Sequence, residues 1–335
     1  MNILLTGGTG YIGSHTAIEL TNAGHHVLLF DNLSNSAEKV VERLSQIAGK
    51  NLTFVYGDVR EAEKIRKILQ QYQIDAVIHF AGLKAVADSV KAPVEYYANN
   101  VQGTINLLEA MQLADIKTLV FSSSATVYGE PDYLPIDESH PTSAVNPYGR
   151  SKLHIEEMLK DVASSDSEWR IACLRYFNPV GAHQSGLIGE SPNDTPNNLM
   201  PFLARVATGA YPELKVFGND YPTSDGTGVR DYIHVMDLAE GHVAALEYLK
   251  EHRGWHAINL GTGRGYSVLE LVHAFEAASG QNIPVKFISR RQGDVAICYA
   301  DSSKAAAELN WRARRDLADM CMSAWLFQKK TDSES

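Results

Sequence analysis

Short apolar, β-branched runs alternate with stretches of helical periodicity along the first half of the chain. Amphipathic stretches occupy residues 61–72 and 101–114. The apolar runs between such stretches are NILLT (2–6), HVLLF (26–30), LTFVYGD (52–58), DAVIHFAG (75–82), KTLVFSS (117–123) and IACLRYFN (171–178). Nearly continuous hydrophobicity is typical of parallel strands buried on both faces. The alternation predicts an α/β fold of the Rossmann type, a doubly wound parallel sheet with helices on both sides.

The pattern changes after residue 178. The stretch 181–201 is rich in Gly, Pro, Asn and Ser, which predicts that loops and short elements dominate after residue 178. We therefore expect a Rossmann domain over residues 1–177 and a smaller α/β domain over residues 178–335. The second domain should cover the ends of the strands, and segments of the two domains should interleave.

Composition restricts the classes of function. The formal net charge of −10 argues against nucleic-acid binding, and an anionic ligand would need local basic groups. No apolar run is long enough to span a bilayer, and an apolar strand begins at once without a targeting segment. Cys173, Cys298 and Cys321 lack metal-ligand spacing, and the histidines form no metal motif. We expect a cytoplasmic protein without a metal site.

A glycine turn follows the first strand and opens a helix. Gly7, Gly10 and Gly13 form G-x-x-G-x-x-G, a variant of the dinucleotide-binding fingerprint, in which small residues let the backbone approach a pyrophosphate. The second strand ends at Asp31, whose carboxylate can accept hydrogen bonds from both ribose hydroxyls and would repel a 2′-phosphate. Together they predict a site for NAD rather than NADP.

Tyr148 and Lys152 stand four residues apart in NPYGRSKLHIEEM (146–158), so a helix places them on one face. Taken alone, this is the spacing of an ordinary surface pair. However, the strand before this helix ends in the serines 122–124, and ligands bind at the carboxyl ends of parallel strands. The nearby ammonium and an oxidised nicotinamide should lower the pKa of Tyr148 toward neutrality, about 4 kcal/mol of differential stabilisation. Tyr148 is then a general base and Lys152 its activator.

Several blocks together carry a resemblance to a known family. They are TGGTGYIG (6–13), HFAGLKAVADS (79–89), NNVQGT (99–104), SSSATVYG (122–129), PYGRSK (147–152), LRYFNPVGAH (174–183), NNLMP (197–201), FGNDYPTSDGTGVRDYIHV (217–235) and NLGTG (259–263). These blocks closely resemble the UDP-glucose 4-epimerases, which belong to the extended short-chain dehydrogenases/reductases. The resemblance covers residues 1 to about 311.

The resemblance implies roles for individual residues. The matching catalytic positions are Ser124, Tyr148 and Lys152. The matching NAD-contacting positions are Gly7, Gly10, Tyr11, Ile12, Gly13, Asp31, Asn32, Asn35, Asp58, Val59, Phe80, Lys84, Asn99, Lys152 and Tyr176. The matching positions for the UDP-sugar are Ser124, Tyr148, Asn178, Asn198, Leu199, Phe217, Arg230, Arg291, Asp294 and Cys298. Independently of the resemblance, Arg230 and Arg291 are planar donors suited to a pyrophosphate.

The implied reaction is redox-neutral. Tyr148 takes the proton of the sugar 4′-hydroxyl while C4 gives a hydride to NAD⁺, and the transient 4-keto sugar turns over before the hydride returns and inverts C4. The cofactor has to stay bound throughout. The resemblance also implies a homodimer that pairs through helices at about 93–112 and 148–163. UDP-glucose and UDP-galactose are the implied substrates.

Two alternatives remain open. One is a sugar-nucleotide 4,6-dehydratase, which needs an extra acid/base pair. By resemblance, such enzymes carry the sequence Thr-Asp-Glu at the positions of Ser124, Ala125 and Thr126 in this chain. A catalytically silent NAD-sensing regulator on the same fold typically lacks the Tyr/Lys pair that is present here. Neither alternative explains the residues as well as an epimerase.

One position departs from the pattern. Many family members carry a tyrosine where this chain has Cys298, although the flanking Gly293-Asp294 and Ala300-Asp301 keep their spacing. Members with a small residue there resemble enzymes that also accept N-acetylhexosamines. We therefore expect interconversion of UDP-GlcNAc and UDP-GalNAc as well. The alternative is that the cysteine arose by neutral drift at a packing position.

Overall fold

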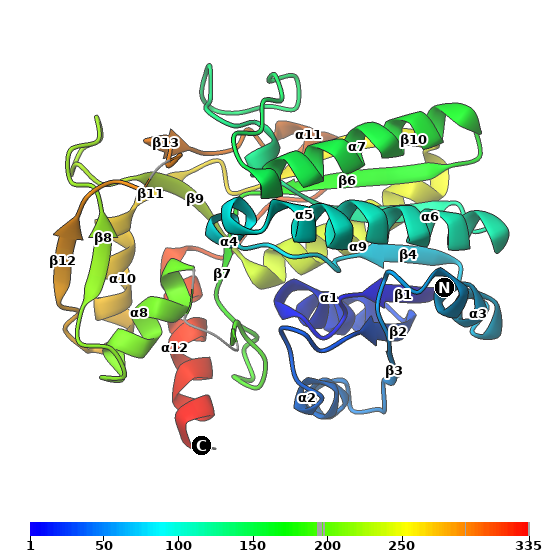
Figure 1. Ribbon diagram of the computed structural model, residues 1–335. Helices are drawn as coiled ribbons and strands as arrows, with labels where there is room; N and C mark the ends of the chain where they lie inside the picture. The colour runs from blue at the N-terminus through cyan, green and yellow to red at the C-terminus, as the bar shows by residue number, and fades with distance from the viewer. Residues whose placement is uncertain (193–195, 197, 292, 334–335) are drawn as a thin grey trace.

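Seven parallel strands form one large sheet in the computed structural model, which describes residues 1–192, 196, 198–291 and 293–333 (Figure 1). Their order across the sheet is β3–β2–β1–β4–β5–β6–β10. They are β1 (Asn2–Thr6), β2 (His26–Asp31), β3 (Thr53–Tyr56), β4 (Ala76–His79), β5 (Thr118–Ser124), β6 (Arg170–Tyr176) and β10 (Gly254–Leu260). The chain reverses its direction of travel between β1 and β4, which confirms the doubly wound, Rossmann-type sheet. In sheets of this kind, ligands bind at the carboxyl ends of the strands beside such a switch point.

Helices cover both faces of this sheet (Figure 1). One face packs under α1 (Tyr11–Asn22), α2 (Lys39–Ala48), α9 (Val235–Glu251) and α11 (Ser303–Glu308). The other packs under α3 (Ala62–Gln71), α6 (Gln102–Leu113) and α7 (Pro147–Ser165). Within β1, Ile3 and Leu5 enter the first core and Leu4 enters the second. Burial on both faces explains why the strands are apolar at consecutive positions.

Short helical elements connect the strands near the switch point. They are α4 (Val86–Lys91), α5 (Pro93–Tyr96), the π-helical turn η1 (Tyr97–Val101) and the 3₁₀ turn η2 (Ala125–Val127).

A second group of elements packs beyond the carboxyl ends of the large sheet (Figure 1). Its strands are β7 (Asn178–Val180), β8 (Leu214–Phe217), β9 (Val229–His234), β11 (Gly265–Ser267), β12 (Val285–Ile288) and β13 (Ile297–Cys298). Its helices are α8 (Leu199–Ala207), α10 (Val268–Ser279) and α12 (Leu317–Ser333), which share a separate apolar core.

The expectation that loops and short elements dominate after residue 178 is wrong. Helices α9 and α12 each have 17 residues, and α10 has 12. The Gly- and Pro-rich stretch is confined to the segment before α8, so its composition is not typical of the residues that come after it. Strand β10 also returns to the large sheet beside β6. The division at residues 177 and 178 stays a prediction.

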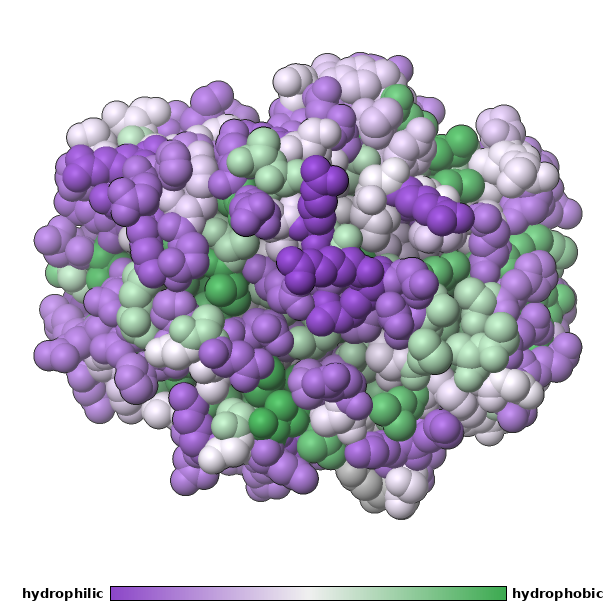
Figure 2. Space-filling model, turned by 180° about the vertical axis from the view of Figure 1, so that it is seen from behind, coloured by the Kyte–Doolittle hydropathy of each residue, from purple (hydrophilic) through white to green (hydrophobic). Residues whose placement is uncertain are grey.

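The outer surface is mainly polar on the face that Figure 2 shows. On this face, seen from behind, the hydrophobic residues lie in small separate groups. None of the helices in the described part of the chain combines the length and apolar composition that a bilayer crossing requires.

Candidate active site

The glycine turn joins β1 to α1 and approaches the loop after β4. Gly7 has φ +68° and its N–H donates to the carbonyl of Phe30 at 2.8 Å. A Cβ on Gly7 would lie 2.7 Å from the amide nitrogen of Ala81, and a Cβ on Gly13 would lie 2.3 Å from the carbonyl oxygen of Gly7. Side chains are excluded at both positions, so the turn leaves its backbone open beside the start of α1. A helix start of this kind suits a dinucleotide pyrophosphate.

Asp31 stands at the end of β2 beside this turn. Its Oδ2 accepts a hydrogen bond from the amide of Thr9 at 3.1 Å, and its Oδ1 accepts one from the amide of Leu33 at 2.8 Å. These two bonds orient a half-buried carboxylate over the glycine turn. A carboxylate in this position could accept from the ribose hydroxyls in the adenosine half of NAD, and this role of Asp31 stays a prediction.

The other predicted cofactor residues follow the ends of neighbouring strands or lie in α1 and η1. Asn32 donates to Asp58 at 2.9 Å, and hydrogen bonding from Arg60 holds the pKa of Asp58 below its usual range. The hydroxyl of Tyr176 lies 2.7 Å from Nε2 of His242, which also packs against Phe80. The remaining positions are Tyr11 and Ile12 in α1, the exposed Asn35 after β2, Val59 after β3, Lys84 after β4 and Asn99 in η1.

Helix α7 begins where the predicted catalytic helix should begin. The side chain of Asn146 caps it by accepting from the amide of Gly149 at 2.8 Å, and Pro147 occupies the first turn. A Cβ on Gly149 would lie 2.8 Å from the carbonyl oxygen of Thr126, so the first turn packs closely on η2. This contact brings Tyr148 to the end of β5, where the side chain of Ser124 lowers the pKa of its phenol.

Lys152 lies one turn further along α7 and is only 4% exposed. Its Nζ donates to the carbonyl of Ser122 at 2.6 Å and lies 5.9 Å from the centre of the Tyr148 ring. Burial lowers the pKa of Lys152 to about 8, against the opposing effect of Glu156. The structure therefore unites the three predicted catalytic residues, Ser124, Tyr148 and Lys152, at one strand end.

The pKa of Tyr148 differs from the expectation. Burial raises the pKa of its phenol above the usual value, and the hydrogen bond with Ser124 acts in the opposite direction. The lowering expected from Lys152 is not found, because burial lowers the pKa of the Lys152 ammonium to about 8, so that Lys152 loses its proton before the phenol does. In this arrangement Ser124 is the group that favours the phenolate.

The predicted substrate residues come from the second group of elements. Cys298 in β13 pairs in register with Arg230 in β9, and Asn178 on β7 pairs with the same strand. Arg291 packs 4.5 Å from the ring of Phe217 and its Nε donates to Asp294 at 3.0 Å. Leu199 begins α8, and Asn198 precedes it at the N-cap position without a side-chain capping bond. Burial and Asp294 raise the pKa of Tyr221, whereas Arg290, Arg230 and Arg291 lower it, so these cations lie around one phenol.

Burial raises the pKa of the Cys298 thiol to about 11. The side chain packs against the cluster of Val127, Tyr128, Ile136, Phe177 and Ala300. Cys298 therefore behaves as a small neutral side chain rather than as a reactive thiol.

Sequence reasoning missed two acidic residues beside this site. Glu190 is 9% exposed and its Oε1 accepts from Lys84 at 2.8 Å and from Asn198 at 2.6 Å, which joins a predicted cofactor residue to a predicted substrate residue. Glu156 is buried one turn after Lys152 on the same face of α7. Extending the four-residue spacing beyond Lys152 would have found Glu156, whereas no local signal identifies Glu190.

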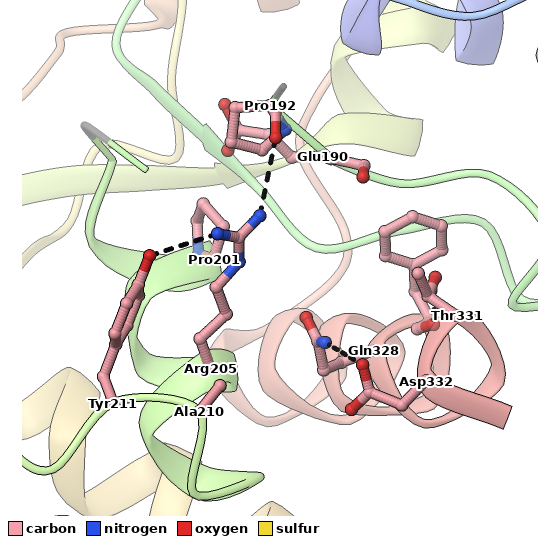
Figure 3. Close-up of a pocket in the computed structure, with 11 residues that line it drawn as sticks. Glu190, Pro192, Pro201, Arg205, Ala210, Tyr211, Gln328, Thr331 and Asp332 are labelled. Carbon is pink, nitrogen blue, oxygen red and sulfur yellow. Dashed lines mark hydrogen bonds between the residues drawn. The ribbon is translucent and has the colours of Figure 1, made fainter. Parts of the chain in front are cut away.

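A cavity of about 310 Å³ opens between α8 and α12, apart from the catalytic residues (Figure 3). Arg205 donates to the hydroxyl of Tyr211 at 3.1 Å on one side, and Gln328 donates to Asp332 at 2.8 Å on the other. Glu190 lines this cavity as well as contacting Lys84. In the described part of the chain, no three His, Cys, Asp or Glu side chains gather as metal ligands.

Comparison with known proteins identifies the family. A family model described as GDP-mannose 4,6 dehydratase matches residues 4–324, so the chain belongs to that family. The UDP-glucose 4-epimerase of Bacillus subtilis (strain 168) is 56% identical over 328 residues, which cover 98% of this chain and 97% of that protein. The chain belongs to the UDP-glucose 4-epimerase family. This confirms the resemblance noted in the sequence.

Solved structures of UDP-glucose 4-epimerases share the fold over the whole length. The Stenotrophomonas maltophila epimerase, solved with bound NAD and formylated UDP-arabinopyranose, has a TM-score of 0.98 and 52% identity, with 100% of both chains covered. The Bifidobacterium longum epimerase, in complex with NAD⁺ and UDP, has a TM-score of 0.97 and 50% identity at the same coverage. These relatives favour an epimerase over a dehydratase, as do Ala125 and Thr126 in η2.

We predict that Ser124→Ala raises the pKa of Tyr148, because the phenolate loses the hydrogen bond that favours it. Ultraviolet titration of tyrosinate, taken as a difference from the Tyr148→Phe variant, measures this pKa. Ser164→Ala, at an exposed serine late in α7, is the matched control. An unchanged Tyr148 titration in Ser124→Ala would contradict the geometry described here.

Proposed function

We propose that the protein is an NAD-dependent isomerase that interconverts UDP-glucose and UDP-galactose by inverting C4 of the sugar. The observation that carries this proposal is the placement of Tyr148, Ser124 and Lys152 at the end of β5, three strands away from Asp31 at the end of β2. The family membership supports the same reaction.

The residues present fit NAD. The glycine turn has no room for side chains at Gly7 and Gly13, and Asp31 is held beside it as an acceptor for ribose hydroxyls. When bound, NAD⁺ supplies a reversible two-electron acceptor for C4. Because the overall reaction is redox-neutral, the same cofactor molecule serves each turnover and should remain with the protein.

The proposed proton transfer uses the chain's own groups. The hydroxyl of Tyr148 takes the proton of the sugar 4′-hydroxyl, with Ser124 as its hydrogen-bond partner and relay. While it is protonated, Lys152 places a cation on the same helix face, and this charge would favour the phenolate as negative charge develops. After the 4-keto sugar has turned about its phosphate linkage, Tyr148 returns the proton while C4 is reduced from the other face.

The nucleotide half of the substrate is proposed to bind between the large sheet and the second group of elements. Arg230 and Arg291 offer planar donors for the pyrophosphate in a chain of net charge −10. Phe217, which carries Arg291 on its ring, offers an apolar surface for the uracil. The other contacts proposed for the UDP-sugar are those of Asn178, Asn198, Leu199, Asp294 and Cys298.

A second pair of substrates is proposed from Cys298. The thiol stands in register with Arg230 at the edge of the cluster around Phe177, where a tyrosine ring would fill more space. The smaller side chain leaves room for an acetamido group. We therefore infer that UDP-GlcNAc and UDP-GalNAc are interconverted as well.

A homodimer is proposed through α5, η1, α6 and the first part of α7. Val94 on α5 is 79% exposed in the single chain, which supports a role for this surface in pairing. All three cysteines are free thiols, and this supports a reducing compartment, for which we propose the cytoplasm.

The direct test is to incubate the purified protein with UDP-glucose, UDP-galactose and their N-acetyl counterparts, without added cofactor, and to analyse the sugars formed. In the same assay, Tyr148→Phe should lower turnover by about 10²- to 10⁴-fold while UDP binding persists, because only the proton-transfer group is removed. Tyr133→Phe is the control, since Tyr133 is exposed and its hydroxyl donates to Asp137 rather than to a catalytic residue. Full activity of Tyr148→Phe would remove Tyr148 from the mechanism.

Asp31→Ala should weaken NAD binding by about 10- to 100-fold, because charge-assisted hydrogen bonds to the ribose contribute about 1.5–3 kcal/mol. It should also reduce discrimination against NADP, since a repelling charge is gone. To test this, the bound cofactor is removed by unfolding, the protein is refolded, and its affinities for added NAD and NADP are measured. Asp132→Ala, at an exposed loop, is the control. Equal binding of NADP and NAD by the native protein would refute the assignment of Asp31.

Cys298→Tyr should depress the N-acetyl reaction selectively, by roughly 5- to 150-fold, because overpacking typically costs about 1–3 kcal/mol. Cys298→Ser, which keeps the small volume, should retain far more of that reaction. The ratio of kcat/KM for UDP-GlcNAc and UDP-glucose measures the effect. A native enzyme that turns over UDP-galactose but ignores UDP-GlcNAc would show that another group closes the pocket.

A further inference from the structure

Glu156 is a buried carboxylate for which the steps above have no use. It lies on α7 four residues after Lys152 and eight after Tyr148, so all three share one face of the helix. Glu156 is 1% exposed. An ionised carboxylate at such a depth needs strong partners, because its desolvation is costly.

The partners of Glu156 tie it to the catalytic strand. Arg175 on β6 donates from Nε to Oε1 at 3.0 Å and from Nη2 to Oε2 at 2.5 Å. The hydroxyl of Ser123, the residue before Ser124, donates to Oε1. Arg175 is held in turn by its bond from Nη1 to the hydroxyl of Tyr128 at 3.0 Å. The carboxylate is therefore fixed between the catalytic helix and two strands.

Several titratable groups surround Lys152, and most of them carry no charge. From β4, His79 faces Lys152 and its pKa is lowered to about 3, so it is neutral. From β6, burial raises the pKa values of Cys173 and Tyr176, so both are neutral as well.

The remaining charged or titratable groups lie on α7, α5 and β6. Tyr148 on α7 carries a negative charge only while it acts as the base. The phenol of Tyr96 on α5 has its pKa raised to about 12. Arg175 is a second cation. Among these described groups, Glu156 is the carboxylate that acts on the ammonium.

We propose that Glu156 is a positioning residue for the epimerase reaction: its carboxylate, anchored by Arg175 and Ser123, keeps the ammonium of Lys152 charged and in place beside Tyr148. This inference rests on the proposed function. Burial works against the charge of Lys152, and Glu156 opposes that effect.

Stability alone is a weak reason for this ion pair. Replacing a buried pair with apolar residues of similar volume is often neutral or stabilising, whereas leaving one buried charge unpaired is costly. The pair of Glu156 and Arg175 joins the catalytic helix to β6, the strand beside the one that ends at Ser124. Its role in this place is to control the charge on Lys152.

Comparison of Glu156→Gln with Glu156→Asp separates charge from shape. Gln keeps the size but removes the charge, so Lys152 loses its proton at lower pH and Tyr148 loses the nearby cation. The rising limb of the kcat–pH profile should then move upward by about one unit, since an opposite charge within about 4–6 Å typically shifts a pKa by 1–3 units. Asp keeps the charge and should hold the native profile more closely, although it packs less well.

A second readout does not depend on turnover. Titration of tyrosinate absorbance, as the difference from the Tyr148→Phe form of each variant, should show the Tyr148 pKa raised in Glu156→Gln and nearer to native in Glu156→Asp. Glu42→Gln, which removes an exposed carboxylate from α2, is the control for net charge. If Glu156→Gln fails to fold, Glu156→Gln with Arg175→Met removes both buried charges and should show a shift in the same upward direction but smaller, because a neighbouring cation is lost together with the carboxylate.

The outcomes distinguish the two proposals. A native protein that does not interconvert the sugars refutes the proposed function. An active native enzyme whose Gln variant, alone or with Arg175→Met, keeps the native pH profile overturns the role of Glu156. A larger shift in Glu156→Asp than in Glu156→Gln would also overturn it, because packing rather than charge would then be the cause.

Discussion

The ammonium of Lys152 is buried between α7 and β5, and the arrangement of the catalytic end depends on how that charge is held. Its Nζ is fixed by the carbonyl of Ser122, 2.6 Å away, and lies 4.8 Å from the centre of the Phe121 ring. These contacts require the first turns of α7 to pack tightly on η2, which the close approach of Gly149 to Thr126 allows. Tyr148 reaches Ser124 because the same packing sets the start of the helix.

The large sheet brings separate pieces of sequence to one edge. Strands β1, β2 and β5 end at the glycine turn, at Asp31 and at Ser124, and β6 ends at Tyr176. Parallel strands align their carboxyl ends, so residues more than a hundred positions apart come together at one edge of the sheet. The second group of elements adds Arg230 and Arg291 beyond this edge. A dinucleotide and a nucleotide sugar can thus meet at Tyr148 without any loop having to span the molecule.

Much of this arrangement could be predicted from the sequence because its signals are local. The strand runs, the glycine turn and the Asn146–Pro147 helix start depend on residues next to one another, and the structure has each of them. The long helices α9 and α12 were not expected, because the prediction for the residues after 178 was based on the Gly- and Pro-rich stretch before α8. The Glu190 contacts with Lys84 and Asn198 join segments far apart, so no local pattern indicates them. The raised pKa of Tyr148 depends on burial and on where Nζ of Lys152 points, which spacing alone does not determine.

The central claim is that one bound cofactor and one tyrosine invert C4 without releasing an intermediate. The most direct measurement follows deuterium placed on C4 of UDP-galactose, with the protein as purified and with excess unlabelled NADH in solution. Mass spectrometry of the UDP-glucose formed should find the deuterium retained on C4. Loss of the label to solvent or to the added cofactor would contradict the account.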